Sequence, residues 1–156
     1  METSMIRTEA DWVEVEQEDR VLMEQRTGFL ALKTSRRPRI VVAEDCEEIR
    51  FGLLRHLRRF HYLVHFATDG IEALRAIRDL EPDVLLLDLG LPRMHGFKVL
   101  HQLRRERIDL PVVVLTGDSS SRSTERALRF GVREVLLKPT PAAVVVASID
   151  RLLRDQ

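Results

Sequence analysis

From residue 39 onwards the sequence alternates short apolar runs with longer amphipathic segments. Five runs are rich in β-branched residues and leucine: Arg39–Glu44, Tyr62–Phe66, Asp83–Asp88, Pro111–Thr116 and Val132–Lys138. Several are almost continuously apolar, which is typical of strands covered by helices on both faces of a parallel sheet. The segments between them have apolar residues three or four positions apart, which predicts helices at 47–60, 70–80, 97–106, 121–130 and 141–153.

This alternation predicts an α/β fold with a doubly wound sheet. Parallel neighbouring strands need a right-handed helical crossover, which returns the chain to the same edge. We therefore expect a five-stranded parallel sheet in the order 2-1-3-4-5 with five helices. The chain has 156 residues, of which 44% are hydrophobic, and this is enough for one sizeable core.

Residues 1–37 do not follow the alternation and are predicted to form an N-terminal extension, partly disordered or loosely helical. A capping-box pattern begins at Thr8, and the basic stretch 33–37 resembles a linker. We expect the domain at 38–156, with no output domain in the chain, because the last helical segment reaches its end. Residues 1–33 carry a net charge of −4 and the remainder +4.

The composition excludes several classes of protein. The single cysteine, Cys46, excludes an internal disulfide framework, and no apolar run approaches the roughly 18 residues of a membrane span. The acidic N-terminus lacks the positive start of a signal peptide, so we expect a cytoplasmic protein. The net charge is zero, and it gives no indication of nucleic acid or an acidic membrane as an obligatory partner.

Polar residues stand where the predicted strands end. Glu44 and Asp45 close the first run, Asp88 the third, Thr116 the fourth and Lys138 the fifth. In open α/β sheets the ligand site lies beyond the carboxyl ends of the strands, so these side chains are expected to converge at one rim. Each residue alone is more often a turn or cap residue; the combination in this order favours a site.

The residue types indicate phosphoryl chemistry with a metal ion. Three neighbouring carboxylates repel one another unless a cation neutralises them, and Mg²⁺ prefers oxygen ligands. Asp88, on the middle strand, is the natural nucleophile. Lys138 would supply a positive charge for a phosphoryl oxygen, and the Thr116 hydroxyl one movable hydrogen bond.

At these residues the chain resembles the receiver family of response regulators, and the resemblance covers residues 38–154. It implies a flavodoxin-like or CheY-like three-layer sandwich and a place in two-component phosphorelay signalling. The matching features are the pair Glu44 and Asp45, Asp88, the loop with Leu91-Pro92 and Gly96, Thr116-Gly117 and Lys138-Pro139.

The resemblance implies roles for individual residues. Asp88 would accept the phosphoryl group from a sensor histidine kinase or a histidine phosphotransfer protein, and a surface would then change for a downstream protein target. Asp45 and Asp88 would bind Mg²⁺ directly, Glu44 through water, and Gly90 through its backbone carbonyl. Intrinsic self-phosphorylation and autodephosphorylation would be the only reactions, so the chain is not expected to be an enzyme in the usual sense.

Further family features are expected around this set. The bond Lys138–Pro139 would be cis and would aim the lysine at the acceptor. Gly117 would leave room for the phosphoryl group. By the resemblance, Gly90 and Asp118 occupy positions that in the family tune the rates of phosphorylation and hydrolysis.

Two residues depart from the family pattern. Val135 stands where many members have a tyrosine or phenylalanine that turns inward when the threonine moves, so the output mechanism must differ. His95 replaces a common acidic residue and is interpreted as an exposed loop histidine. The other histidines, His56, His61, His65 and His101, lack the spacing of metal ligands.

Alternatives remain beside this reading. Val135 would also fit a degenerate receiver that works as a phosphorylation-independent binding or dimerisation module, and the sequence does not separate a signalling switch from a phosphoryl carrier. A haloacid-dehalogenase-like phosphatase would need an aspartate at Gly90. A flavodoxin-like cofactor binder would need a phosphate-cradling loop instead of the acidic segment 44–48.

Two surface contacts are further hypotheses. One is a homodimer through the face formed by 121–130, 132–138 and 141–153. The other uses a basic stripe, Arg122, Arg126, Arg129 and Arg133, on which the acidic extension would dock according to phosphorylation.

Overall fold

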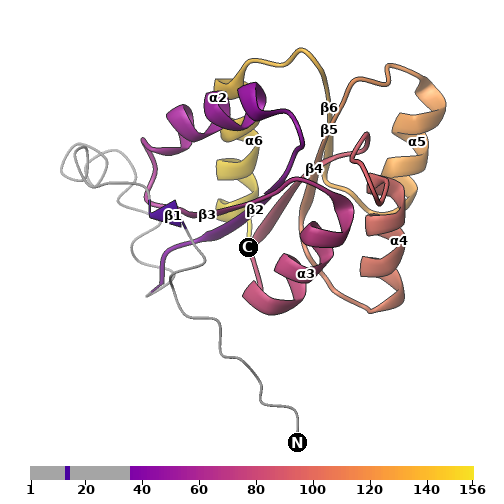
Figure 1. The fold of residues 1–156 in the computed structure, drawn as a ribbon, viewed down its shortest axis with the longest axis horizontal. Coiled ribbons are helices and arrows are strands. Elements are labelled where there is room, and N and C mark those ends of the chain that lie inside the picture. The colour runs from indigo at the N-terminus through magenta and orange to yellow at the C-terminus, as the bar shows by residue number, and fades with distance from the viewer. Residues whose placement is uncertain (1–12, 15–35) are drawn as a thin grey trace, which may run out of the picture.

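The computed structural model describes residues 13–14 and 36–156, and it has a central parallel sheet between two layers of helices (Figure 1). The parallel strands are β2 (Arg39–Ala43), β3 (Leu63–Ala67), β4 (Val84–Asp88), β5 (Val112–Thr116) and β6 (Glu134–Leu137). The helices are α2 (Glu47–Leu57), α3 (Gly70–Leu80), α4 (Gly96–Arg105), α5 (Ser121–Arg129) and α6 (Ala142–Arg154). The predicted elements are confirmed, with ends that differ by up to three residues.

The strand order is β3-β2-β4-β5-β6, and all these neighbours are parallel. This confirms the predicted order 2-1-3-4-5. Strand β4 lies in the middle, and all five of its residues are buried. Its last residue, Asp88, pairs in register with Leu115 of β5. The register therefore brings the ends of the central strands to the same level.

A sixth strand, β1 (Val13–Glu14), was not expected. It runs antiparallel to β3, where Val13 pairs with Val64 and Glu14 with Leu63. The outer edge of β3 offers unpaired backbone groups, and pairing satisfies them better than the loose helix expected for this part of the chain. The rest of that expectation, including the capping box at Thr8, lies outside the described residues.

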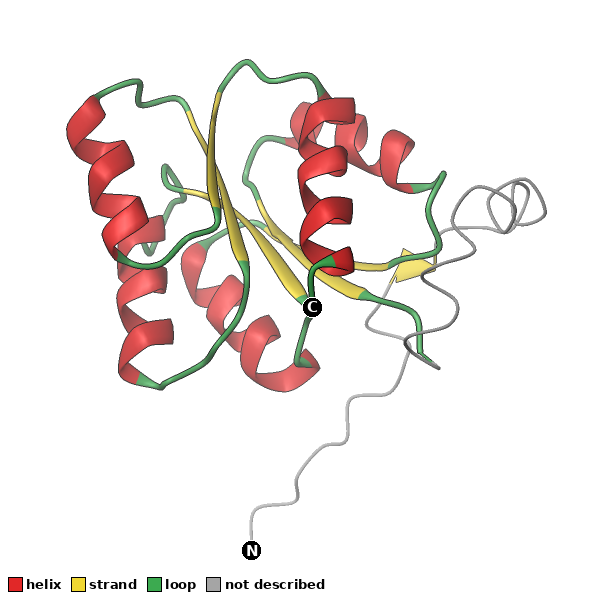
Figure 2. Ribbon diagram, turned by 180° about the vertical axis from the view of Figure 1, so that it is seen from behind, coloured by secondary structure: helices red, strands yellow, loops and turns green. Residues whose placement is uncertain are grey.

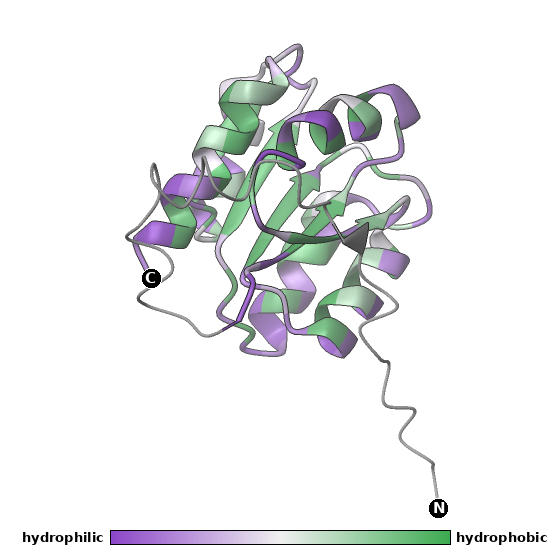
Figure 3. Cartoon of the chain, turned by 90° about the vertical axis from the view of Figure 1, so that its left-hand side faces the viewer, coloured by the Kyte–Doolittle hydropathy of each residue, from purple (hydrophilic) through white to green (hydrophobic). Residues whose placement is uncertain are grey.

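The apolar side chains of the sheet divide between two cores. Leu85 and Leu87 of β4 face the core beneath α3 and α4, while Val84 and Leu86 face the core beneath α2 and α6. Figure 2 shows the helices on both sides of the sheet, and Figure 3 shows apolar strands between helices whose outer faces are hydrophilic. Full burial of each such side chain stabilises the fold by about 1.5–3 kcal/mol. The near-continuous apolar runs are explained by this two-sided cover.

Polar side chains mark where helices begin. Asp69 caps α3, where its carboxylate accepts hydrogen bonds from the backbone of Ile71 and Glu72, both 2.8 Å long. Ser120 caps α5 through Ser123 N. The longest helix, α6, has 13 residues, and among residues 13–14 and 36–156 no helix has the length and apolar character to cross a membrane.

Candidate functional site

The ends of four parallel strands carry the polar residues singled out in the sequence. Asp88 is the last residue of β4 and Thr116 the last of β5, while Glu44 follows β2 and Lys138 follows β6 directly. The backbone N–H of Lys138 donates to the carbonyl of Thr116 at 2.7 Å. The structure therefore gathers these side chains at one rim of the sheet, as the strand order requires.

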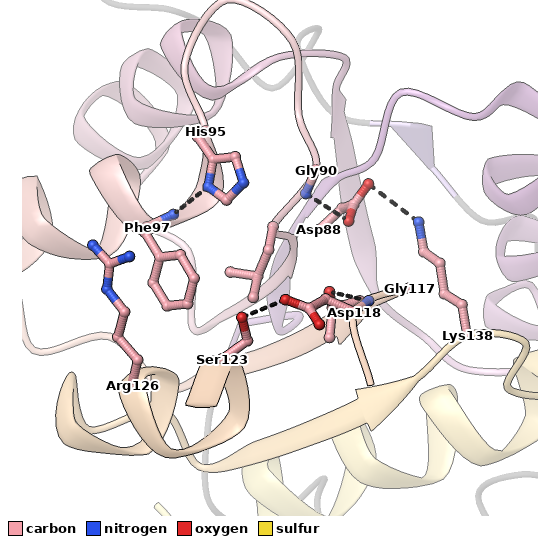
Figure 4. Close-up of a pocket in the computed structure, with 11 residues that line it drawn as sticks. Asp88, Gly90, His95, Phe97, Gly117, Asp118, Ser123, Arg126 and Lys138 are labelled. Atoms are coloured by element: carbon pink, nitrogen blue, oxygen red, sulfur yellow. Dashed lines mark hydrogen bonds and ion pairs between the residues drawn. The ribbon is translucent and has the colours of Figure 1, made fainter. Parts of the chain in front are cut away.

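Three carboxylates lie together at this rim. Glu44, Asp45 and Asp88 each offer an oxygen atom, and these atoms all lie within 4.8 Å of one another. Glu44 is 1% exposed and Asp88 6%, whereas Asp45 is exposed. The Lys138 ammonium lies 2.8 Å from Oε2 of Glu44 and 3.1 Å from Oδ2 of Asp88. One lysine thus pairs with both buried acids, and Figure 4 shows its contact with Asp88.

Burial and charge shift the proton affinities of this group. Burial raises the pKa of Glu44, and the charge of Asp88 raises it further, against the opposing effect of Lys138. For Lys138, burial lowers the pKa, but the hydrogen bond with Glu44 and the charge of Asp88 outweigh it, so its pKa is raised. The ammonium therefore stays charged at neutral pH, and the cluster still holds more negative than positive charge.

The donor set suits a hard divalent cation. Glu44 Oε2 is buried and makes no hydrogen bond of regular geometry with any described residue, although Lys138 is its ionic neighbour. A cation would neutralise the excess negative charge, and carboxylate oxygens are ligands that Mg²⁺ prefers. The carboxylate oxygens of Glu44, Asp45 and Asp88 lie close enough together to share such a cation.

Backbone contacts hold the acids in place. Nη1 of Arg50 donates to the carbonyls of Glu44 and Asp45 at 2.8 and 2.7 Å, and Cys46 N donates to Glu44 Oε1 at 3.0 Å. Gly90 N donates to Asp88 Oδ1 at 3.0 Å. These bonds fix the orientation of both buried carboxylates. Arg50 gave no signal in the sequence, because an arginine one turn into a helix is ordinary.

The loop after Asp88 packs against backbone at two glycines. A Cβ at Gly96 would lie 2.7 Å from both the Asp88 carbonyl oxygen and Leu89 Cα, and one at Gly70 would overlap the Met94 carbonyl. Arg93 in this loop pairs with the Asp69 carboxylate at 2.8 Å. Asp69 was not predicted from the sequence, although aspartate directly before a helical pattern is a capping signal.

Beyond Asp88 a cleft of about 530 Å³ extends along β5 and α5. It is lined by Gly90, His95, Phe97, Thr116, Asp118 and Arg126 among others, and Lys138 stands at its other end (Figure 4). Gly117 also lines this cleft, and a Cβ there would meet nothing within 4 Å. No sequence pattern indicated that Phe97 or Arg126 would line this cleft.

The remaining predicted residues lie as follows. The Lys138–Pro139 bond is cis, as expected. Val135 is half-buried and packs against the core beneath α3 and α4. The exposed His95 accepts from Phe97 N at 3.4 Å, so it also marks the start of α4. His56 hydrogen-bonds to the carbonyl of Gly52 within α2.

The predicted basic stripe is exposed but not uniform. Arg126 turns its guanidinium over the ring of Phe97, and Arg129 lies 3.8 Å from Glu125. Arg122 and Arg133 are exposed. Docking of the acidic extension on this surface stays a prediction, because nearly all of that extension lies outside the described residues.

Comparison with known proteins gives a consistent result. The family described as "Response regulator receiver domain" matches residues 40–150. The response regulator MprA of Mycobacterium ulcerans is 39% identical over 116 residues, which are 74% of this chain and 50% of MprA. The chain therefore spans about half the length of the curated relatives it matches.

Solved structures resemble the fold closely. The receiver domain of the Francisella response regulator 1452 has a TM-score of 0.72 at 26% identity and covers 76% of this chain and 98% of its own. The non-phosphorylated HemR receiver domain of Leptospira biflexa has a TM-score of 0.69 at 28% identity, covering 75% and 94%.

Proposed function

The chain belongs to the response regulator receiver family of two-component signalling, and we propose that Asp88 is the residue on which it accepts a phosphoryl group. The observation that carries the proposal is the setting of Asp88. It ends the central strand β4, is 6% exposed, and has Lys138 Nζ 3.1 Å from one carboxylate oxygen. A cleft opens beside it, so a phosphodonor has access.

In the proposed reaction a carboxylate oxygen of Asp88 attacks the phosphorus of a phosphohistidine. The phosphorus–nitrogen bond breaks, its electron pair returns to the imidazole, and an acyl phosphate forms on Asp88. Lys138 then faces a phosphoryl oxygen, and the Thr116 hydroxyl donates a hydrogen bond to another. Attack of water on the phosphorus later restores the carboxylate and releases phosphate.

Receiver domains generally depend on Mg²⁺, and the acidic cluster has the ligands for it. Asp45, Asp88 and the Gly90 carbonyl are proposed to bind the ion directly, and Glu44 through water. When bound, Mg²⁺ neutralises charge on the incoming phosphoryl oxygens. The raised pKa of the buried Glu44 supports this assignment, because a second positive charge nearby would stabilise its carboxylate form.

Response regulators interact with histidine kinases or histidine phosphotransfer proteins, and we propose one of these, in the cytoplasm, as the phosphodonor. A downstream protein would read the changed surface. A homodimer through α5, β6 and α6 is a separate proposal. Its support is that three of the four exposed large apolar side chains among the described residues, Leu128, Leu137 and Val144, lie on these elements.

The test is the intact mass after incubation with acetyl phosphate and Mg²⁺. We expect the wild type to gain one phosphoryl group, and we expect no gain for Asp88→Asn or after chelation of the metal. Asp109→Asn, an exposed acid next to β5 at the far end of the strands, is the matched control and should behave as the wild type. A wild type that gains no mass would favour the degenerate receiver, a binding module that works without phosphorylation.

A further inference from the structure

The cleft beside Asp88 has an aromatic ring, although Val135 supplies none. Phe97 of α4 is 8% exposed and lines this cleft, and the Arg126 guanidinium of α5 lies over its ring, 4.1 Å from the centroid. The His95 ring stacks on the Phe97 ring with 5.7 Å between the centroids, and the centroid of the Phe130 ring lies 6.2 Å from that of Phe97. The Phe97–Arg126 contact therefore joins two helices beside the acceptor.

The Phe97 side of this contact is fixed to the acceptor strand. Gly96, which precedes Phe97, donates its N–H to the Leu89 carbonyl at 3.0 Å. The close approach of Gly96 to the Asp88 backbone leaves no room for even a Cβ. The backbone directly before Phe97 is thus held against the strand end that carries Asp88.

The start of helix α5, which carries Arg126, is linked to Thr116 by a chain of hydrogen bonds. The Thr116 hydroxyl accepts from Asp118 N at 3.1 Å. The Asp118 carboxylate accepts from Ser120 N at 2.9 Å and from the Ser123 hydroxyl (Figure 4). Ser123 lies one helical turn before Arg126, and α5 buries only Ala127. Hydrogen bonds therefore connect the Thr116 hydroxyl to the first turn of α5.

We propose that the Phe97–Arg126 pair couples the acceptor to α5 in this receiver, in place of the aromatic switch that Val135 cannot provide. The proposal rests on the proposed function of Asp88. When Thr116 turns its hydroxyl to a phosphoryl group on Asp88, it leaves Asp118 N, and the segment Asp118–Ser123 shifts. Arg126 then leaves the ring of Phe97, and its guanidinium becomes available on the α5 surface. Phe97 and Arg126 act as positioning residues and do not touch the reacting atoms.

The coupling predicts a linkage that can be measured. A contact present only in the unphosphorylated conformer opposes binding of a phosphoryl group, so its removal strengthens that binding. A cation–π contact at an exposed site corresponds to an effect of about two- to five-fold on an equilibrium constant. A Phe97–Arg126 contact that is equally present in both conformers would have no such effect.

Beryllofluoride, which mimics a phosphoryl group on a carboxylate, serves as the probe, titrated by calorimetry in Mg²⁺ into the full chain. We expect Arg126→Met to bind it about two- to five-fold more tightly than the wild type. Phe97→Leu should show the same increase in beryllofluoride affinity, and the double variant should bind no more tightly than either single variant. Arg104→Met, an exposed arginine near the opposite end of α4 from Phe97 and outside the basic stripe, is the matched control and should leave the affinity unchanged.

A second measurement follows the contact directly. The Arg126 Nε–H and side-chain proton signals should be shifted upfield by the Phe97 ring in the free protein and should lose this shift with beryllofluoride. Equal affinity of Arg126→Met and wild type, or a ring shift that persists with the ligand, would overturn the coupling. Because Arg126 is exposed, its variant tests the idea even where Phe97→Leu fails to fold.

The two proposals fail differently. A wild type that gains mass from acetyl phosphate and binds beryllofluoride, with unchanged affinity in Arg126→Met, would overturn the coupling alone. A wild type that binds no beryllofluoride and gains no mass would overturn the function of Asp88, and the coupling with it.

Discussion

The two walls of the cleft beside Asp88 are held in different ways. The acceptor wall, formed by β2, β4 and the loop 88–96, buries Glu44 and Asp88 and packs backbone against backbone at Gly96. The opposite wall, formed by β5, α5 and β6, is looser beyond β5. Helix α5 buries one residue, Ala127, and no residue of β6 is fully buried.

This difference matches two physical requirements. Phosphoryl transfer needs carboxylates held in fixed positions, because small displacements of reacting groups slow the reaction greatly. A signalling surface needs elements that can rearrange at small free-energy change, and such elements have few buried apolar contacts. The chain keeps its candidate acceptor on the first kind of wall and the hydrogen-bonded segment 116–123 on the second.

The largest expected contrast comes from the same substitution on two strands that contribute to one core. Leu86 of β4 is 1% exposed, whereas Leu136 of β6 is only partly buried. We expect Leu86→Ala to lower the free energy of unfolding by about 3–4 kcal/mol and Leu136→Ala by about 1–2 kcal/mol. Urea unfolding followed by circular dichroism measures both. Equal losses would show that the two walls are equally well packed.

Two glycines at the cleft separate stability from function. Gly96→Ala forces a Cβ against the Asp88 carbonyl and Leu89 Cα, and we expect a loss of about 2–3 kcal/mol in unfolding free energy. Gly117→Ala meets open space and should change stability by less than about 0.5 kcal/mol. It should nevertheless slow phosphorylation, because the methyl group occupies space needed by the phosphoryl group.

Both effects can be measured on the same samples, by urea unfolding and by the rate of mass gain with acetyl phosphate. A stable Gly96→Ala variant would mean that the acceptor wall yields more easily than its backbone contacts indicate. Normal phosphorylation of Gly117→Ala would remove the steric role predicted for that glycine.

The sequence predicted the features that depend on strand periodicity. Residues 84–87 are apolar on both faces, which is typical of a parallel sheet covered on two sides, and this placed Asp88 and Lys138 at the carboxyl ends of their strands. The edge strand β1 was missed, because pairing of Val13 and Glu14 with β3 leaves no period in two residues. Backbone pairing of this kind depends on the sheet that is already formed.

Contacts between helices were also beyond the sequence. The position of Arg126 over Phe97 depends on how α4 and α5 lie relative to each other, and helical spacing only placed Arg126 on an exposed face. The support of the acids by Arg50 likewise uses backbone carbonyls, which every residue has. Sequence patterns identify side chains with distinctive chemistry and leave the contacts of ordinary ones open.

The smallest predicted effect concerns the negative charge of Asp69, which pairs with Arg93 in the acceptor wall. Asp69 caps α3 and pairs with Arg93 of the loop after Asp88. Its pKa is lowered, first by the hydrogen bond from the backbone of Glu72 and also by the charge of Arg93. Asp69→Asn keeps an oxygen for the cap but loses the charge, so we expect a loss of about 0.5–1 kcal/mol at pH 7.

The stabilisation by the Asp69 charge depends on pH. Because the pKa of Asp69 in the folded protein lies below its ordinary value of 3.8, the charge stabilises the fold above that pH, and the stabilisation disappears as the pH falls through the folded pKa. Urea unfolding of both proteins from pH 7 to pH 3 should therefore show a difference that shrinks only below about 3.8. Arg93→Met, which removes the ion pair and keeps the cap, should lose less. A difference that is the same at every pH would mean that backbone packing at Gly70 and Gly96, and not charge, holds this wall.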